Sequence, residues 1–124
     1  MKRAEELKIV NDQYASPTLA DTLAAVALRV AETEKNALYH VSGTSCISRY
    51  NFTKKIACAM GYSDNLVKPV ESRSFVQAAK RPTNSCLNCE KLQKELNYNL
   101  PDVDQSLAIM RSQMEMESPS LLGN

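Results

Sequence analysis

The sequence predicts an α/β fold, because short apolar runs alternate with segments of helical periodicity. An apolar run predicts a strand at residues 7–11, and an amphipathic pattern predicts a helix at 18–32. The order then repeats with a strand at 37–42 and a helix at 48–60. At 124 residues, the chain forms one domain at most.

The first helix is predicted from one apolar stripe, and we expect this stripe to face the core. Its members recur at helical spacing: Leu19, Leu23, Val26, Ala27 and Val30. Thr18 and Asp21 have the spacing of a capping box, which predicts that the helix begins at Thr18.

The second strand and helix have clear end signals. Gly43 ends the strand, Ser48 is the expected N-cap of the helix, and Gly61 is expected at its C′ position. The only histidine, His40, lies within this strand. It is interpreted as an exposed or hydrogen-bonded residue rather than a general base, because no carboxylate or nucleophile is near it in sequence.

The pattern in the second half of the sequence predicts mostly shorter strands and helices. Residues 66–70 form a possible strand, which Pro69 confines to a sheet edge. Residues 71–80 lack a period and indicate a surface loop. Asn88 is expected to cap a short helix that ends at Leu96. The last helix begins at Leu100-Pro101-Asp102, and its apolar face is formed by Val103, Leu107, Met110 and Met114.

The predicted domain organisation has three parts. Residues 1–6 are charged and are expected to be a disordered lead-in. Residues 7–114 form the folded portion, and residues 115–124 are expected to be a flexible tail.

Charge and hydropathy exclude several classes of partner. Fifteen basic and fourteen acidic side chains leave a net charge of +1, so no nucleic acid or anionic membrane is expected as a partner. No apolar run approaches the roughly 20 residues of a spanning helix. The N-terminus carries no apolar signal core, which predicts a cytoplasmic protein.

The cysteines are Cys46, Cys58, Cys86 and Cys89. Without a secretion signal we expect free thiols that behave as small buried apolar residues. Cys86 and Cys89 form a single C-x-x-C, but the further close ligands of a zinc site and the other elements of a redox fold are not visible. No metal is predicted.

The turn at residues 11–18 is the first candidate binding segment. It carries polar side chains between a strand and a helix, where α/β proteins often bind ligands. The alternative is that these side chains only cap the backbone. Arg81 is the second candidate, because Pro82 holds it extended and an arginine so held suits bidentate phosphate binding. The alternative is an exposed loop arginine.

Four stretches, in this order, cover residues 7 to about 110: NDQYASPTLADTLA, ALYHVSGTSCISRYNFTKKIA, AKRPTNSCLNCEKL and LPDVDQSLA. Together they resemble the C-terminal, substrate-binding portion of dTDP-4-dehydrorhamnose reductases, members of the extended short-chain dehydrogenase/reductase group. The resemblance implies the C-terminal part of an NAD(P)-binding Rossmann-like fold, lacking the N-terminal dinucleotide-binding segment. It also implies that the strands at 7–11 and 37–42 join a larger parallel sheet.

The resemblance further implies a function. The family reduces the 4-keto group of dTDP-4-dehydro-6-deoxy-L-mannose with NADPH or NADH, in dTDP-L-rhamnose biosynthesis. Gln13, Tyr14, Ser16 and Thr18 would border the dTDP-sugar, and Arg81 would bind its diphosphate. The expected partners are this substrate and either a second copy of the chain or a dinucleotide-binding segment.

The chemistry of catalysis is not visible in the residues. The three glycines, Gly43, Gly61 and Gly123, form no phosphate-binding pattern. Tyr50 and Lys54 have the Y-x-x-x-K spacing of short-chain reductases, but in the resemblance the catalytic pair precedes residue 11. We therefore predict no catalytic residue here and no activity for this chain alone.

Two alternatives remain open from the sequence. The pattern of Arg81-Pro82 with residues 87–92 also resembles the regulatory β subunit of methionine adenosyltransferase, a non-catalytic binding module. The other alternative is an α/β domain whose matches arise by chance.

Overall fold

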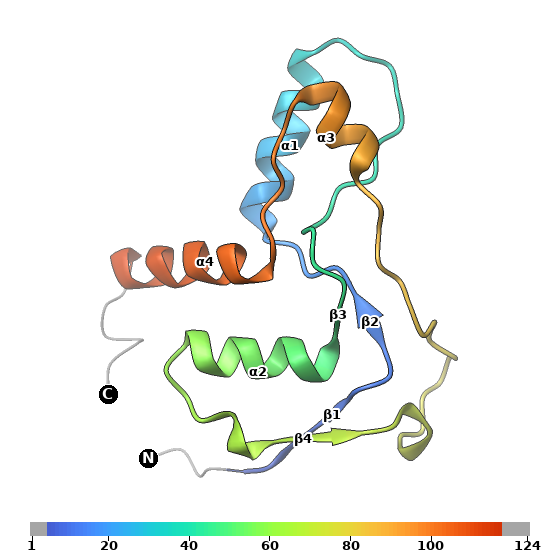
Figure 1. The fold of residues 1–124 in the computed structure, drawn as a ribbon, viewed down its shortest axis with the longest axis vertical. Coiled ribbons are helices and arrows are strands. Elements are labelled where there is room, and N and C mark those ends of the chain that lie inside the picture. The colour runs from blue at the N-terminus through green and yellow to red at the C-terminus, as the bar shows by residue number, and fades with distance from the viewer. Residues whose placement is uncertain (1–4, 118–124) are drawn as a thin grey trace.

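The computed structural model describes residues 5–117 and has a mixed α/β fold (Figure 1). The strands are β1 (Leu7–Val10), β2 (Tyr14–Ala15), β3 (Ile47–Ser48) and β4 (Val67–Val70). The helices are α1 (Ala20–Glu32), α2 (Arg49–Ala59), α3 (Glu90–Leu96) and α4 (Val103–Glu117). Two 3₁₀ turns, Asp64–Leu66 and Ser72–Ser74, flank β4. Of the expected lead-in at 1–6 and tail at 115–124, residues 1–4 and 118–124 lie outside the described part. Helix α4 continues to Glu117, past the expected boundary at residue 114.

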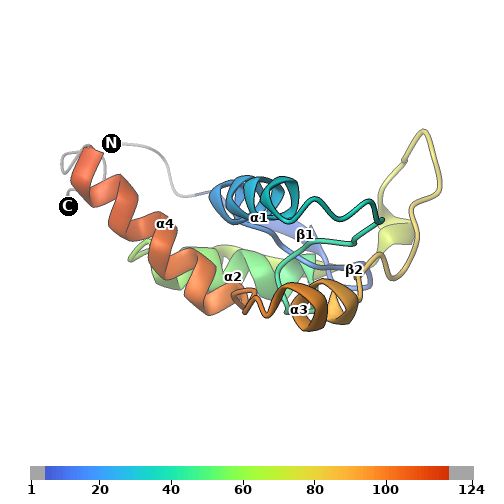
Figure 2. The same cartoon turned by 90° about the horizontal axis from the view of Figure 1, so that it is seen from above.

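The elements form two packed groups that β2 and β3 connect (Figures 1 and 2). In one group α1 lies beside α3. In the other, α2 lies between α4 and the β1–β4 pair, and it contacts both. Residues near the start of the chain and residues beyond 80 therefore meet at the junction of the two groups.

The two strand pairs differ in direction. β1 and β4 are parallel, and Pro69 lies opposite Ile9, which agrees with the predicted edge strand. β2 and β3 are antiparallel, with Tyr14 opposite Ser48. The predicted strand at 37–42 is wrong for the described chain, because this segment is extended but belongs to neither strand pair. A strand needs a neighbouring strand to which its backbone can hydrogen-bond. The apolar pattern of one segment cannot show whether such a neighbour is present. His40, within it, is exposed.

The α1–α3 group has a small apolar core. Val26 of α1 and Leu92 of α3 are completely buried. Its other buried members are Cys89, Leu96 and Leu100, and it is lined by Val30, Tyr39, Val41 and Tyr98. Tyr39 also donates a hydrogen bond to Glu95, which raises the pKa of the Tyr39 phenol.

The predicted ends of α2 are confirmed. Ser48 is the N-cap and its Oγ accepts a hydrogen bond from the backbone N–H of Asn51 at 3.1 Å. Gly61 follows the helix with a φ of 78°, in the left-handed region that glycine tolerates without a Cβ clash.

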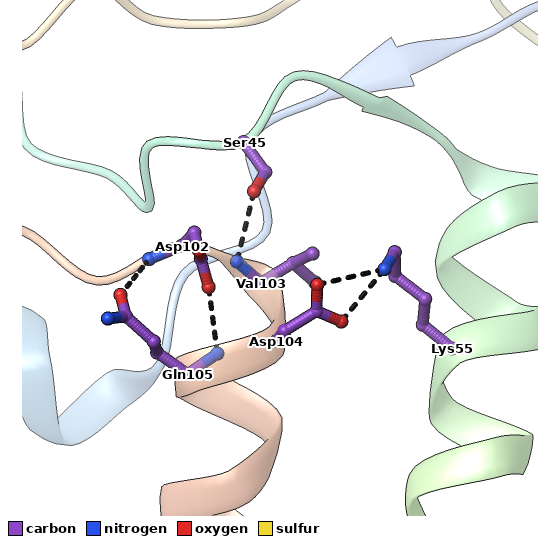
Figure 3. A network of polar contacts seen from close by, with 6 residues as sticks. All are labelled: Ser45, Lys55, Asp102, Val103, Asp104 and Gln105. Carbon is purple, nitrogen blue, oxygen red and sulfur yellow. Dashed lines mark hydrogen bonds and ion pairs between the residues drawn. The ribbon is translucent and has the colours of Figure 1, made fainter.

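A polar network holds the start of α4 against α2 (Figure 3). Asp102 and Gln105 form a capping box, because each backbone N–H donates to the other side chain, at 3.0 and 2.8 Å. Ser45 Oγ accepts from the backbone N–H of Val103 at 3.0 Å. Lys55 Nζ contacts both carboxylate oxygens of Asp104, at 2.8 and 3.0 Å. These contacts explain why α4 begins where the sequence predicts.

The predicted start of α1 is wrong. The helix begins at Ala20, its N-cap is Leu19, and no side chain caps it. Thr18 Oγ1 instead donates to the backbone carbonyl of Ser16 at 2.9 Å, an alternative that the spacing of Thr18 and Asp21 does not reveal. The predicted apolar stripe is only partly buried, because Val26 is inside whereas Leu23 is 47% exposed.

The expectation of four free thiols is also wrong. Cys46 and Cys86 form a disulfide, because the fold places their Cα atoms 5.6 Å apart, within the range that a disulfide spans. Cys58 and Cys89 remain free, the first exposed and the second buried. The bond joins the residue before β3 to the segment that follows Arg81.

Candidate functional site

Two neighbouring cavities lie where the predicted binding residues meet. The first has a volume of about 270 Å³ and is lined by Gln13, Tyr14, Ala15, Arg49, Arg81, Pro82 and Ser85. The second, of about 400 Å³, is lined by Asp12, Gln13, Ser72, Arg73, Phe75, Gln77, Ala79, Lys80, Arg81 and Thr83. Gln13 and Arg81 line both cavities, so together the two form one candidate binding groove.

β2 is the central element of this groove. On one side it pairs with β3, which leads directly into α2. On the other side the backbone N–H of Tyr14 donates to Thr83, and its carbonyl accepts from Ser85, at 2.8 and 2.9 Å. This pairing brings the segment that carries Arg81 next to the turn at residues 11–18. Tyr14 is 41% exposed and therefore available to a ligand.

Gln13 is held in place by a polar network beneath the groove. Its side chain is only 6% exposed, and its Nε2 donates to Ser72 Oγ at 2.9 Å. Ser72 Oγ in turn donates to the Asp12 carboxylate at 2.6 Å, and the backbone N–H of Ser72 donates to the same carboxylate. The Ser72 hydroxyl, followed by its backbone N–H, lowers the pKa of Asp12 because both hydrogen bonds favour the charged form.

Two of the predicted site residues lie outside this groove. Ser16 Oγ accepts from the backbone N–H of Leu87 at 3.2 Å. Thr18 Oγ1 accepts from the backbone N–H of Gly43, also at 3.2 Å. These two hydroxyls hold the turn to neighbouring segments, as in the alternative in which polar side chains only satisfy backbone groups. Gln13, Tyr14 and Arg81, in contrast, converge.

Arg49 is one of the lining residues that the sequence analysis did not identify. It is the first residue of α2, and its backbone N–H donates to the carbonyl of Gln13 at 3.0 Å. The Ser48 N-cap predicts the helix start, and hence the position of Arg49, but only the pairing of β2 with β3 brings Arg49 to Tyr14.

The turn that leads into α1 does not have the features of a loop that binds a nicotinamide dinucleotide. Such a cofactor needs backbone that closely approaches its pyrophosphate at a helix start, which glycine allows. The turn that leads into α1 contains Pro17 and no glycine. We therefore derive no chemical step through this cofactor.

The Tyr50–Lys54 pair is arranged for packing and charge pairing. Lys54 Nζ lies 5.7 Å from the centroid of the Tyr50 ring, over its face, and 3.2 Å from the carboxylate of Asp64. Asp64 raises the pKa of Lys54. Neither residue lines the candidate groove.

Residues 5–117 contain neither of two further classes of site. In this range no three histidine, cysteine or acidic side chains are grouped so that they could hold a metal ion. None of the helices there combines the length and apolar character that a membrane-spanning helix requires.

Comparison with known proteins decides the family. The family model described as the RmlD substrate binding domain matches residues 1–116. The chain belongs to the RmlD substrate-binding domain family. This confirms the resemblance seen in the sequence.

The relatives of this RmlD-family chain are reductases. It is 32% identical to the dTDP-4-dehydrorhamnose reductase of Aggregatibacter actinomycetemcomitans over 92% of the chain, and 32% identical to that of Escherichia coli K12 over 82%. It spans 42% and 37% of the length of these two proteins.

Solved structures agree with the family assignment. The dTDP-4-dehydrorhamnose reductase of Bacillus anthracis, in complex with NADP, matches with a TM-score of 0.82 and 30% identity, over 88% of this chain and 38% of that one. The orthologue from Clostridium acetobutylicum matches with a TM-score of 0.81 and 28% identity, over 90% and 40%. The chain therefore has the fold of the C-terminal portion of a Rossmann-like extended short-chain reductase.

Proposed function

We propose that this chain is the nucleotide-sugar-binding part of an NAD(P)H-dependent reductase. The substrate would be dTDP-4-dehydro-6-deoxy-L-mannose, whose 4-keto group is reduced in dTDP-L-rhamnose biosynthesis. The observation that carries the proposal is the convergence of Gln13, Tyr14 and Arg81 on one groove, in a chain of the RmlD substrate-binding family.

Each of these residues has a role that its surroundings support. Tyr14 offers an exposed aromatic face and a hydroxyl to the base or sugar. Gln13, fixed through Ser72, contributes polar contacts of defined orientation. Arg81 supplies the charge for the diphosphate, and its guanidinium suits phosphate oxygens. Ser16 and Thr18 shape the turn that presents Gln13 and Tyr14.

Catalysis is assigned to a segment other than the described residues. NADPH or NADH would be bound by a dinucleotide-binding segment that is separate from the described residues, and that segment would provide the catalytic tyrosine and lysine. The working partner is such a segment or a second copy of the chain, and the expected compartment is the cytoplasm. This chain by itself is proposed to be inactive.

Binding is tested by titrating the purified chain with dTDP, with UDP and with dTDP-L-rhamnose in a calorimeter. The thymidine nucleotides should bind, and Arg81→Ala should weaken binding at least about tenfold, the loss expected for one charge-assisted hydrogen bond. Arg29→Ala is the matched control, since Arg29 lies in the last turn of α1 and does not line the groove. Equal loss in both variants would contradict the assignment of Arg81.

Activity is tested separately, by following NADPH oxidation with the keto-sugar. No turnover is expected from the chain alone, and robust oxidation would refute its inactivity. Recovery of a stoichiometric synthetase partner, with no affinity for thymidine nucleotides, would favour the regulatory alternative.

A further inference from the structure

The groove contains a second arginine whose role the proposed function leaves open. Arg49 lines the 270 Å³ cavity together with Arg81. The ion pairs among residues 5–117 join Lys54, Lys55, Arg73, Lys94 and Arg111 to acidic side chains, and none involves Arg49 or Arg81. Both guanidinium groups are therefore without a carboxylate partner in the described part of the chain.

The fold holds the two arginines on opposite sides of β2. Arg49 follows β3 directly, and its backbone is bonded to Gln13 at 3.0 Å. Arg81 precedes the segment that pairs with Tyr14 on the other side. The disulfide between Cys46 and Cys86 ties these two flanking segments together. The backbone segments that carry Arg49 and Arg81 are thus held together before any ligand binds, which reduces the entropy cost of binding.

The charges in this cavity are unbalanced. Its lining contains two guanidinium groups and no acidic side chain. The carboxylate of Asp12 lines only the adjoining cavity, where it is hydrogen-bonded to Ser72. Two adjacent arginines without a counterion match an anion that carries two or more charges over neighbouring phosphate groups.

We propose that Arg49 is a second phosphate-binding residue, and that Arg49 and Arg81 together bind the diphosphate of a nucleoside diphosphate in the 270 Å³ cavity. This inference rests on the proposed function and deepens it by assigning the diphosphate to this cavity. The 400 Å³ cavity, whose lining includes Gln13 and Phe75 together with the charged Asp12, Arg73 and Lys80, then remains for the rest of the ligand.

The test is calorimetric titration of the 124-residue chain with two probes, inorganic pyrophosphate and dTDP. Arg49→Ala should weaken both affinities at least about tenfold, as expected for loss of a charge-assisted hydrogen bond. Arg49→Lys keeps the charge but loses the planar fork, so an intermediate loss is expected. Arg29→Ala removes the same charge away from the cavity and should change neither affinity more than about twofold, the limit expected for a distant exposed charge. Circular dichroism checks that each variant is folded.

The outcomes separate this inference from the proposed function. Suppose that dTDP binds well and that the affinity of Arg49→Ala for dTDP is within about twofold of the wild-type affinity, the limit expected for a distant exposed charge. The role of Arg49 is then refuted and the proposed function stands. If pyrophosphate binding depends on Arg49 but dTDP and dTDP-L-rhamnose bind no better than pyrophosphate, the anion site stands and the nucleotide-sugar function fails. Absence of binding to both probes refutes both. An equal loss in Arg29→Ala also refutes the inference, because net charge alone would then explain the effect.

Discussion

The disulfide between Cys46 and Cys86 gives the sharpest stability prediction. It closes a segment with a sequence separation of 40 residues. Reduction, or Cys46→Ser with Cys86→Ser, opens this loop and restores conformational freedom mainly to the unfolded chain.

The magnitude follows from the length of the loop. The chain-entropy relation gives about 4 kcal/mol at 25 °C for a closed loop of roughly 40 residues. With a urea dependence of about 2 kcal/mol per molar, as expected for a small domain, the unfolding midpoint should fall by about 2 M.

The assay is urea unfolding followed by circular dichroism, with and without dithiothreitol. Thiol titration of the unfolded, unreduced protein should find the free Cys58 and Cys89 only, and all four cysteines after reduction. Cys58→Ser is the matched control, because Cys58 is exposed and free, and it should leave the midpoint unchanged.

Two results would refute this reasoning. One is a wild-type midpoint that moves less than about 0.5 M on reduction, well below the shift worked out above. The other is an equal effect of dithiothreitol on the double serine variant, which has no such bond to reduce.

Three further perturbations test the packing and the polar network. Leu92→Ala should lower the free energy of unfolding by about 2–5 kcal/mol, measured by urea unfolding, because Leu92 is completely buried. Gly43→Ala should lower it by about 1–3 kcal/mol, since an added Cβ would lie 2.2 Å from the carbonyl oxygen of Pro17; unchanged stability would contradict this packing. Ser72→Ala should raise the pKa of Asp12, measured by NMR titration. Since that pKa is lowered in the folded state, its stabilisation is present at neutral pH and is lost as pH falls below about 4. The variant keeps the backbone N–H bond to Asp12 and should therefore show a smaller pH dependence.

The features that the sequence predicted correctly depend on residues close together in the chain. Ser48 caps α2 through Asn51, and Gly61 ends it, within single turns. The predicted start of α4 is local in the same way, because Asp102 and Gln105 bond to each other there. Such contacts need no distant partner, so nearby residues can predict them, although the spacing of Thr18 and Asp21 predicted a cap that does not form.

The turn at residues 11–18 was found from its polar residues, but the sequence could not show which of them face a ligand. All lie in one short segment, yet Ser16 and Thr18 bond to the backbone of Leu87 and Gly43. These partners come from distant parts of the chain. Which polar side chain remains available to a ligand is therefore decided only by what packs beside it.

The sequence by itself determined the α/β class, because periodicity and capping depend on residues that are close together in the chain. Its four ordered motifs indicated the family, and the candidate roles of Gln13, Tyr14 and Arg81 follow from that resemblance. The tertiary structure decided the bond between Cys46 and Cys86 and the position of Arg49. Both depend on β2 pairing with segments far away in the chain, on either side of it. Long-range pairing is selected by the whole fold, so no spacing within one segment can reveal it.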